Sequence, residues 1–204
     1  GVITIAPEAN ATNVYERGYK YVFSILPPAP MLMAPIAYMM DEMLDPKPKT
    51  VAIIAANDLF PLSCAEGFRD HCEELGFDVV LFEKYPAGST DVSALLTKVK
   101  GLNPDVLGVG GYTADSLMVI RQSQELDLNP KLYAFSVGVM VPAYIDEMGS
   151  AGNYAVEGEW WLPGMQLEDP IFGTTEQFNQ ACRDLFGEDF RPQYWTASSA
   201  AAGS

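Results

Sequence analysis

The sequence predicts an α/β fold with a doubly wound parallel sheet. Apolar runs with the composition of strands alternate with helical patterns along most of the chain, and the repeat is about 25 residues, the length of a βα unit. The run at residues 106–109 is apolar throughout, as is typical of a parallel strand that helices cover on both faces. The intervening helices are long enough to cross back over such a sheet.

Each predicted strand is a short apolar run. These runs occupy residues 2–5, 50–55, 78–82, 105–110, 131–136 and 154–161, and the repeat begins with the second of them. The helices between them carry apolar residues at helical spacing and span residues 31–44, 62–75, 91–102, 114–126 and 139–148. With right-handed crossovers, the units from residue 50 onward make one complete sheet.

The segment from residue 85 to 112 shows the pattern most fully. Its helix carries one apolar stripe at i, i+3, i+4, i+7 and i+10, formed by Val92, Leu95, Leu96, Val99 and Leu102. Asn103-Pro104 stops this helix, and the next strand ends on Gly110, Gly111 and Tyr112. Tyr112 is therefore expected at the carboxyl edge of the sheet, where open α/β folds bind their ligands.

Proline-rich segments bracket the repeating block and predict its limits. We expect one lobe at residues 29–162, complete or nearly so, and parts of a second lobe at 1–28 and 163–204. The flanks offer only isolated elements: a helix and a strand at residues 11–18 and 21–24, and helices at 175–186 and 196–202. Because the chain starts on a bare strand and stops inside a helix, we expect most of the second lobe to lie outside it.

Composition excludes several function classes. The formal charge is −15, from 27 acidic and 12 basic residues with no basic stripe, so nucleic acid is not expected as a partner. His71 is the only histidine, and three scattered cysteines do not make a zinc site. His71 and the adjacent Cys72 point in different directions on a helix and do not form a catalytic pair. No phosphate-binding or dinucleotide fingerprint appears, so we expect no cofactor and no enzyme.

Six segments follow one another in an order that is informative: residues 7–12, 17–23, 49–54, 85–112, 121–122 and 194–197. In this order they resemble the type I periplasmic solute-binding proteins of the branched-chain amino acid group. The resemblance implies two lobes, the lobe at 29–162 having a flavodoxin-like sheet, that close on a small polar ligand about a hinge. It also implies a membrane permease of an ATP-driven importer as partner, and a periplasmic or otherwise extracytoplasmic, lipid-anchored location.

Two aromatic residues are candidates on the lobe at 29–162. Tyr112 matches the family's ligand-facing tyrosine, although a tyrosine after two glycines is also a common loop anchor. Phe60 stands where the family commonly has an aromatic side chain, and would offer a ring face without a hydroxyl. The alternative for Phe60 is packing against the helix predicted from residue 62.

Glu8, Ala9 and Asn10 match the first-lobe loop that receives a ligand carboxylate at a helix N-terminus. Two of them depart from the family pattern. Glu8 puts a negative charge beside this anion site, and Asn10 replaces the usual hydroxyl residue. Asn10 is alternatively a cap for the helix that follows.

Val137 stands near the point where the family's amino acid binders commonly place an acidic side chain for the ligand's ammonium group. Valine cannot pair with an ammonium. Either Asp58, Asp115 or Glu8 takes over this role, or the ligand is a small carboxylic acid, an aromatic acid or an amide.

The sequence thus predicts a non-catalytic solute-binding protein of an ABC importer. A ligand-sensing effector domain of a regulator or receptor with the same fold is the alternative. An enzyme on a flavodoxin-like sheet is a third possibility, for which no catalytic constellation is found.

Overall fold

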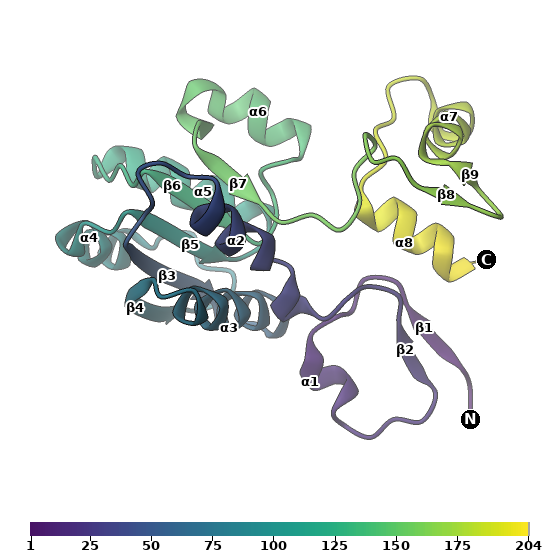
Figure 1. Ribbon diagram of the computed structural model, residues 1–204, viewed down its shortest axis with the longest axis horizontal. Coiled ribbons are helices and arrows are strands. Elements are labelled where there is room, and N and C mark those ends of the chain that lie inside the picture. The colour runs from purple at the N-terminus through teal and green to yellow at the C-terminus, as the bar shows by residue number, and fades with distance from the viewer. Residues whose placement is uncertain (204) are drawn as a thin grey trace. The chain divides into compact units, whose positions relative to one another are not determined.

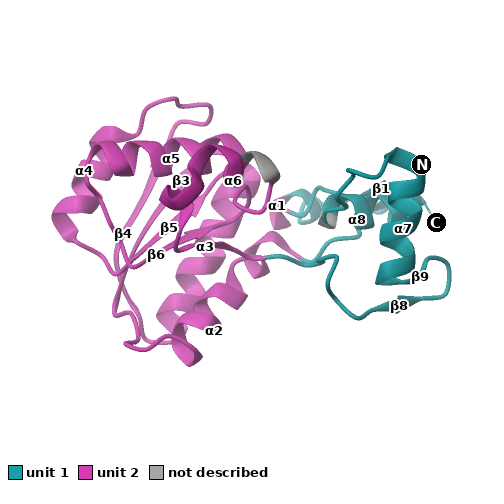
Figure 2. Ribbon diagram, turned by 90° about the horizontal axis from the view of Figure 1, so that it is seen from above, with its two compact units in different colours: residues 1–10, 14–27, 159–204 teal, residues 11–13, 28–158 magenta. Residues whose placement is uncertain are grey.

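The computed structural model describes residues 1–203, and all of their side chains except those of residues 142, 143, 145 and 194. Ser204, the last residue of the predicted segment 163–204, lies outside the described residues. The chain divides into two compact units, shown in different colours in Figure 2. Unit 1 comprises residues 1–10, 14–27 and 159–204, and unit 2 comprises residues 11–13 and 28–158.

Unit 2 contains a five-stranded parallel sheet with the strand order β4-β3-β5-β6-β7 (Figure 1). The strands are β3 (Thr50–Ala56), β4 (Asp78–Tyr85), β5 (Val106–Gly110), β6 (Leu132–Phe135) and β7 (Ala155–Glu157). The chain adds β4 on one side of β3 and then continues on the other side with β5. The strand order therefore reverses between β3 and β5, which makes their carboxyl ends the topological switch point of a doubly wound sheet.

Helices cover both faces of this sheet (Figure 2). The helices α4 (Ser93–Leu102), α5 (Thr113–Glu125) and α6 (Pro142–Met148) lie on one face, and α2 (Ala34–Glu42) and α3 (Leu59–Glu74) on the other. The core on the first face includes Ala52, Ile54, Leu107, Val109, Leu96, Val99, Val119 and Ile120. Burial on both faces explains why the β3 side chains from Val51 to Ala56 are at most 1% exposed.

The α/β prediction is confirmed, and element boundaries differ for local reasons. The helix predicted from residue 62 begins at Leu59, because the Asp58 carboxylate accepts the Leu59 N–H at 2.7 Å and caps α3. The helix predicted at 31–44 is divided into a 3-10 turn (Ala29–Met31) and α2. The strand predicted at 154–161 ends at Glu157, and at Gly158 a Cβ would lie 1.8 Å from the Leu32 carbonyl oxygen.

Unit 1 is smaller and has little regular structure. The strands β1 (Thr4–Ala6) and β2 (Val22–Ser24) form a parallel pair, and β8 (Glu168–Asp169) and β9 (Gly173–Thr174) an antiparallel one. Its helices are α1 (Thr12–Tyr15), the first two residues of which fall in unit 2, α7 (Thr175–Phe186) and α8 (Tyr194–Gly203). The α7 bounds match the predicted helix, since Thr174 and Gln177 form a capping box at its start. No helix within residues 1–203 has the length and apolar character needed to cross a membrane.

Glycines let α3 lie directly on the end of β5. A Cβ at Gly110 would stand 2.2 Å from the Pro61 carbonyl oxygen, and one at Gly108 would stand 2.8 Å from the Phe68 ring. Phe68 is fully buried. A side chain at Gly110 would therefore push the first turn of α3 away from the sheet, and one at Gly108 would displace the Phe68 ring.

We therefore expect Gly110→Ala to lower the free energy of unfolding by about 1–3 kcal/mol through overpacking. Gly101→Ala is the matched control, because a Cβ at this position in α4 meets nothing within 4 Å. Alanine there is expected to be neutral or to stabilise by up to about 1 kcal/mol. Urea unfolding measures both, and equal stabilities for the two variants would contradict the close approach.

Candidate functional site

The candidate site lies at the carboxyl ends of β3 and β5 in unit 2. We call residues 57–60 and 111–115 the switch-point edge. The first segment links β3 to α3, and the second links β5 to α5. In open α/β sheets this place gathers loops from two strands beside a crevice, so it is where a ligand is expected.

Tyr112 and Phe60 meet at this edge, as a shared ligand surface requires. Their rings are stacked with centroids 5.7 Å apart and planes inclined by 26°. The Tyr112 hydroxyl donates a hydrogen bond to the Asp58 Oδ2 at 3.1 Å. Tyr112 remains 44% exposed, so this aromatic pair and its carboxylate present a surface rather than a filled core.

A buried carboxylate fixes the backbone beneath Tyr112. Asp115 is only 8% exposed, and its Oδ2 accepts the Tyr112 N–H at 2.8 Å. Its Oδ1 accepts the Tyr85 hydroxyl at 3.0 Å. Burial, followed by the charge of Asp115, raises the pKa of Tyr85, so this phenol stays a donor at neutral pH. Asp115 thereby ties the end of β4 to the start of α5.

The phenol of Tyr112 is also held in its neutral form. Burial, and next the negative charge of Asp58 and the hydrogen bond to it, raise the pKa of Tyr112 to about 12. A neutral hydroxyl donates its proton to Asp58 and leaves its oxygen free to accept a second hydrogen bond.

Val137 lies in the loop after β6 and is half-buried. Its carbonyl oxygen accepts the Ser116 hydroxyl at 2.7 Å. The neighbouring Ser136 hydroxyl bonds both the N–H and the carbonyl of Gly111, at 2.9 and 2.8 Å. These bonds attach the β6 loop to the switch-point edge, although the Val137 side chain brings no charge.

The other predicted residues, Glu8, Ala9 and Asn10, belong to unit 1. Glu8 accepts a hydrogen bond from the Ser198 hydroxyl, and burial raises the pKa of its carboxyl group. Asn10 is 2% exposed and donates to the Pro27 carbonyl at 3.0 Å, while its Oδ1 has no hydrogen-bond partner among the described residues.

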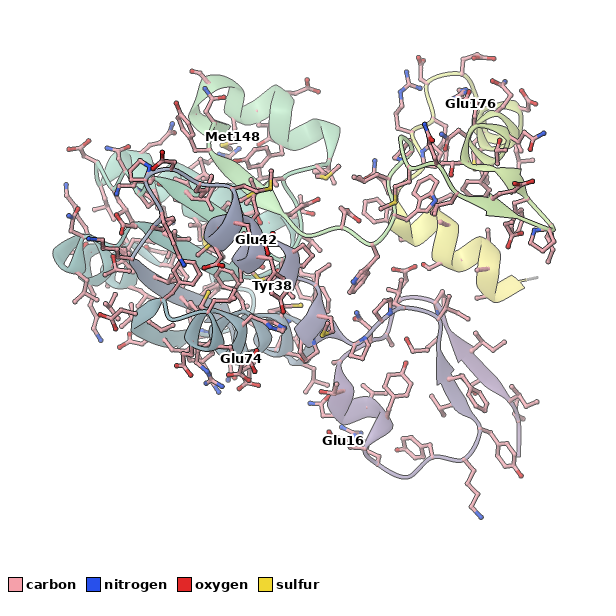
Figure 3. The ribbon with its side chains drawn as sticks, in the orientation of Figure 1. Glu16, Tyr38, Glu42, Glu74, Met148 and Glu176 are labelled. Atoms are coloured by element: carbon pink, nitrogen blue, oxygen red, sulfur yellow. The ribbon has the colours of Figure 1, made fainter. Side chains whose placement is uncertain are left out.

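His71 and Cys72 do not form a reactive pair. Figure 3 labels two neighbours of His71, Tyr38 on α2 and Glu74 at the end of α3. The Tyr38 and His71 ring centroids are 6.0 Å apart, and the His71 Nδ1 lies 3.6 Å from a Glu74 oxygen. Cys72 is fully buried, and burial raises the pKa of its thiol to about 12. Within the described residues, no group of three or more His, Cys, Asp or Glu side chains is arranged to hold a metal ion.

Tyr85 and Glu157 were missed as supporting residues. Their partners lie 30 and 18 residues away in the sequence, so no local pattern reveals them. Asp115 carries a weaker local signal, because an acidic side chain at the third helical position can accept the N–H of the residue before the helix, here Tyr112.

A family model described as periplasmic binding protein matches residues 1–204. The chain belongs to the periplasmic binding protein family. Its relatives and structural neighbours place it among the type I members of the branched-chain amino acid group.

Three proteins illustrate the similarity. A leucine-, isoleucine-, valine-, threonine- and alanine-binding protein of Pseudomonas aeruginosa is 28% identical over 133 residues, covering 64% of this chain and 35% of that protein. A leucine-binding protein of Thermotoga maritima superposes with a TM-score of 0.80 at 20% identity, covering 99% of this chain and 55% of the other. A solute-binding protein of Rhodopseudomonas palustris, solved with 3,4-dihydroxybenzoic acid, gives 0.75 at 17% identity, covering 98% and 53%. The matches thus span 35% to 55% of the length of these proteins.

The hydrogen bond between Tyr112 and Asp58 predicts a titration difference. Because the pKa of Tyr112 in the folded protein, about 12, lies above that of a free tyrosine, about 10, the neutral hydroxyl stabilises the fold fully below pH 10. This contribution is lost as the pH rises through 12. In Asp58→Asn the pKa of Tyr112 is expected to fall toward 10.

The phenolate absorbance of Tyr112 is the difference between the pH titration of a protein that has Tyr112 and that of the same protein with Tyr112→Phe. This difference is measured once with Asp58 and once with Asp58→Asn. A midpoint that stays the same with and without the Asp58 charge would show that the two side chains do not interact.

Proposed function

We propose that this chain is part of the solute-binding component of an ABC importer. In this role a small amino acid, or another small organic acid or amide, binds between two lobes that close about a hinge, and a membrane permease receives the loaded form. Family membership supports a solute-binding role. The observation that carries the proposal is the stacked pair of the half-buried Phe60 and the exposed Tyr112 at the topological switch point.

The relatives support a binding role rather than catalysis. The P. aeruginosa relative is named for five amino acids, and the R. palustris neighbour was solved with an aromatic acid. In this chain we propose that no bond of the ligand is broken. The family name and these transport proteins also favour a periplasmic or other extracytoplasmic location.

Hinge closure follows a simple free-energy argument. A ligand shifts the equilibrium toward the closed form only by contacts that it makes there and not in the open form. The switch-point edge supplies a surface that is ordered before binding, because Asp115 fixes the Tyr112 backbone and Phe60 supports its ring. Little ordering free energy is then spent when the ligand arrives.

Isothermal titration calorimetry of the full-length protein tests the proposal. The titrants are the common amino acids and a set of aromatic acids that includes dihydroxybenzoic acid. Tyr112→Ala is expected to weaken the observed ligand at least about tenfold, since it removes an aromatic face and a hydrogen-bonding group.

Tyr154→Ala is the matched control. Tyr154 is 76% exposed and directly precedes β7, so it lies at the amino edge of the same sheet. Its loss is expected to leave binding unchanged. Absence of heat with every titrant, or equal effects of the two tyrosine variants, would refute the proposal.

A further inference from the structure

The carboxyl edge of the unit 2 sheet carries negative charge without any positive counterpart in its loops. The loops that follow β3, β4, β5 and β6 are residues 57–58, 86–92, 111–112 and 136–141, and none of them contains lysine, arginine or histidine. Asp58 and Asp91 lie in these loops, and Asp115 lies in the first turn of α5. A ligand anion facing this edge would be repelled, whereas a cation would be attracted.

The backbone N–H groups at this edge are largely committed to partners within the protein. Those of Leu59 and Tyr112 donate to Asp58 and Asp115. The Gly111 N–H donates to the Ser136 hydroxyl, and those of Val139 and Met140 donate to the two carboxylate oxygens of Glu157. Helix N-termini bind anions through free N–H groups, and here the protein's own carboxylates occupy that role.

The carboxylates at the edge differ in what they still offer. Asp115 is buried and accepts one donor on each oxygen, and both oxygens of Glu157 hold the loop after β6. Asp58 is exposed and also accepts one bond on each oxygen. A carboxylate offers about four acceptor positions, so Asp58 retains free positions that face solvent. It takes part in none of the ion pairs found among residues 1–203.

The groups beside Asp58 also suit a cation. The face of an aromatic ring attracts an ammonium group within about 6 Å of its centroid. Phe60 and Tyr112 present two such rings next to the Asp58 carboxylate. The Tyr112 hydroxyl donates its proton to Asp58, so the lone pairs of the Tyr112 oxygen are available to a further donor.

We propose that Asp58 is the counter-charge for an ammonium group of the ligand, held beside the rings of Tyr112 and Phe60. This inference rests on the proposed function and narrows its ligands to compounds that carry an ammonium group, amino acids foremost. Val137, in the loop after β6, has no charge to pair with an ammonium group. In this proposal Asp58, in the loop after β3, supplies that negative charge instead.

The test compares Asp58→Asn with Asp91→Asn in the full-length protein. Both variants remove one negative charge from the same edge. Asp91 is exposed and accepts the Ser93 N–H at the start of α4, much as Asp58 accepts the Leu59 N–H at the start of α3. The amide oxygen of asparagine can accept the same N–H at either position, so both variants are expected to fold, which thermal unfolding checks.

The calorimetric probes form matched sets. L-Leucine is compared with isocaproate, which lacks the ammonium, and isoamylamine, which lacks the carboxylate. L-Phenylalanine is compared in the same way with hydrocinnamate and phenethylamine. We expect binding only where an ammonium is present, and a loss of about 10- to 100-fold in Asp58→Asn with little change in Asp91→Asn.

Three outcomes would overturn the inference. Equal affinities of the two asparagine variants for an ammonium-bearing probe would refute Asp58 while leaving the proposed function intact. Binding of isocaproate or hydrocinnamate as tightly as the parent amino acid would refute the ammonium requirement, again without touching the proposed function. Binding of none of these probes, nor of any titrant in the wider series, would refute both.

Discussion

The close approach of α3 to the carboxyl end of β5 is the constraint on which the site depends. It is possible only because Gly108 and Gly110 leave room for the Phe68 ring and for the backbone at Pro61. With α3 seated on the sheet, its cap residue and first turn reach the end of the neighbouring strand. Phe60 then stacks on Tyr112, and Asp58 receives the Tyr112 hydroxyl, although 54 residues separate the last two in the sequence.

A second constraint is that the buried polar groups at this edge have hydrogen-bond partners. A buried carboxylate is costly unless it is hydrogen-bonded, and Asp115 meets that condition by joining the ends of β4 and β5. The half-buried Glu157 accepts two N–H groups of the loop after β6. These bonds occupy backbone N–H donors that an anion would need. Asp58, in contrast, keeps acceptor positions that are not occupied by these donors. The hydrogen bonds of Asp115 and Glu157 therefore fix the backbone at this edge and also occupy those N–H groups.

The sequence predicts the class of fold well because its signals are local. Apolar runs such as residues 106–109 and the stripe from Val92 to Leu102 define strands and helices without knowledge of the rest of the chain. Only part of the site can be predicted from such local signals. Tyr112 is placed by its position after a strand, but the roles of Tyr85 and Glu157 depend on partners in other elements. Asp58, Asp115 and Glu8 differ in their hydrogen-bond partners and burial, which no sequence pattern contains.

The central claim is that this edge receives the ammonium end of a ligand. The most direct measurement is a crystal structure of the full-length protein with an ammonium-bearing ligand bound. The account predicts the ligand nitrogen at hydrogen-bonding distance, about 2.7–3.2 Å, from an Asp58 carboxylate oxygen and over the Tyr112 or Phe60 ring. A ligand carboxylate turned toward Asp58, or an ammonium held by groups elsewhere in the protein, would contradict it.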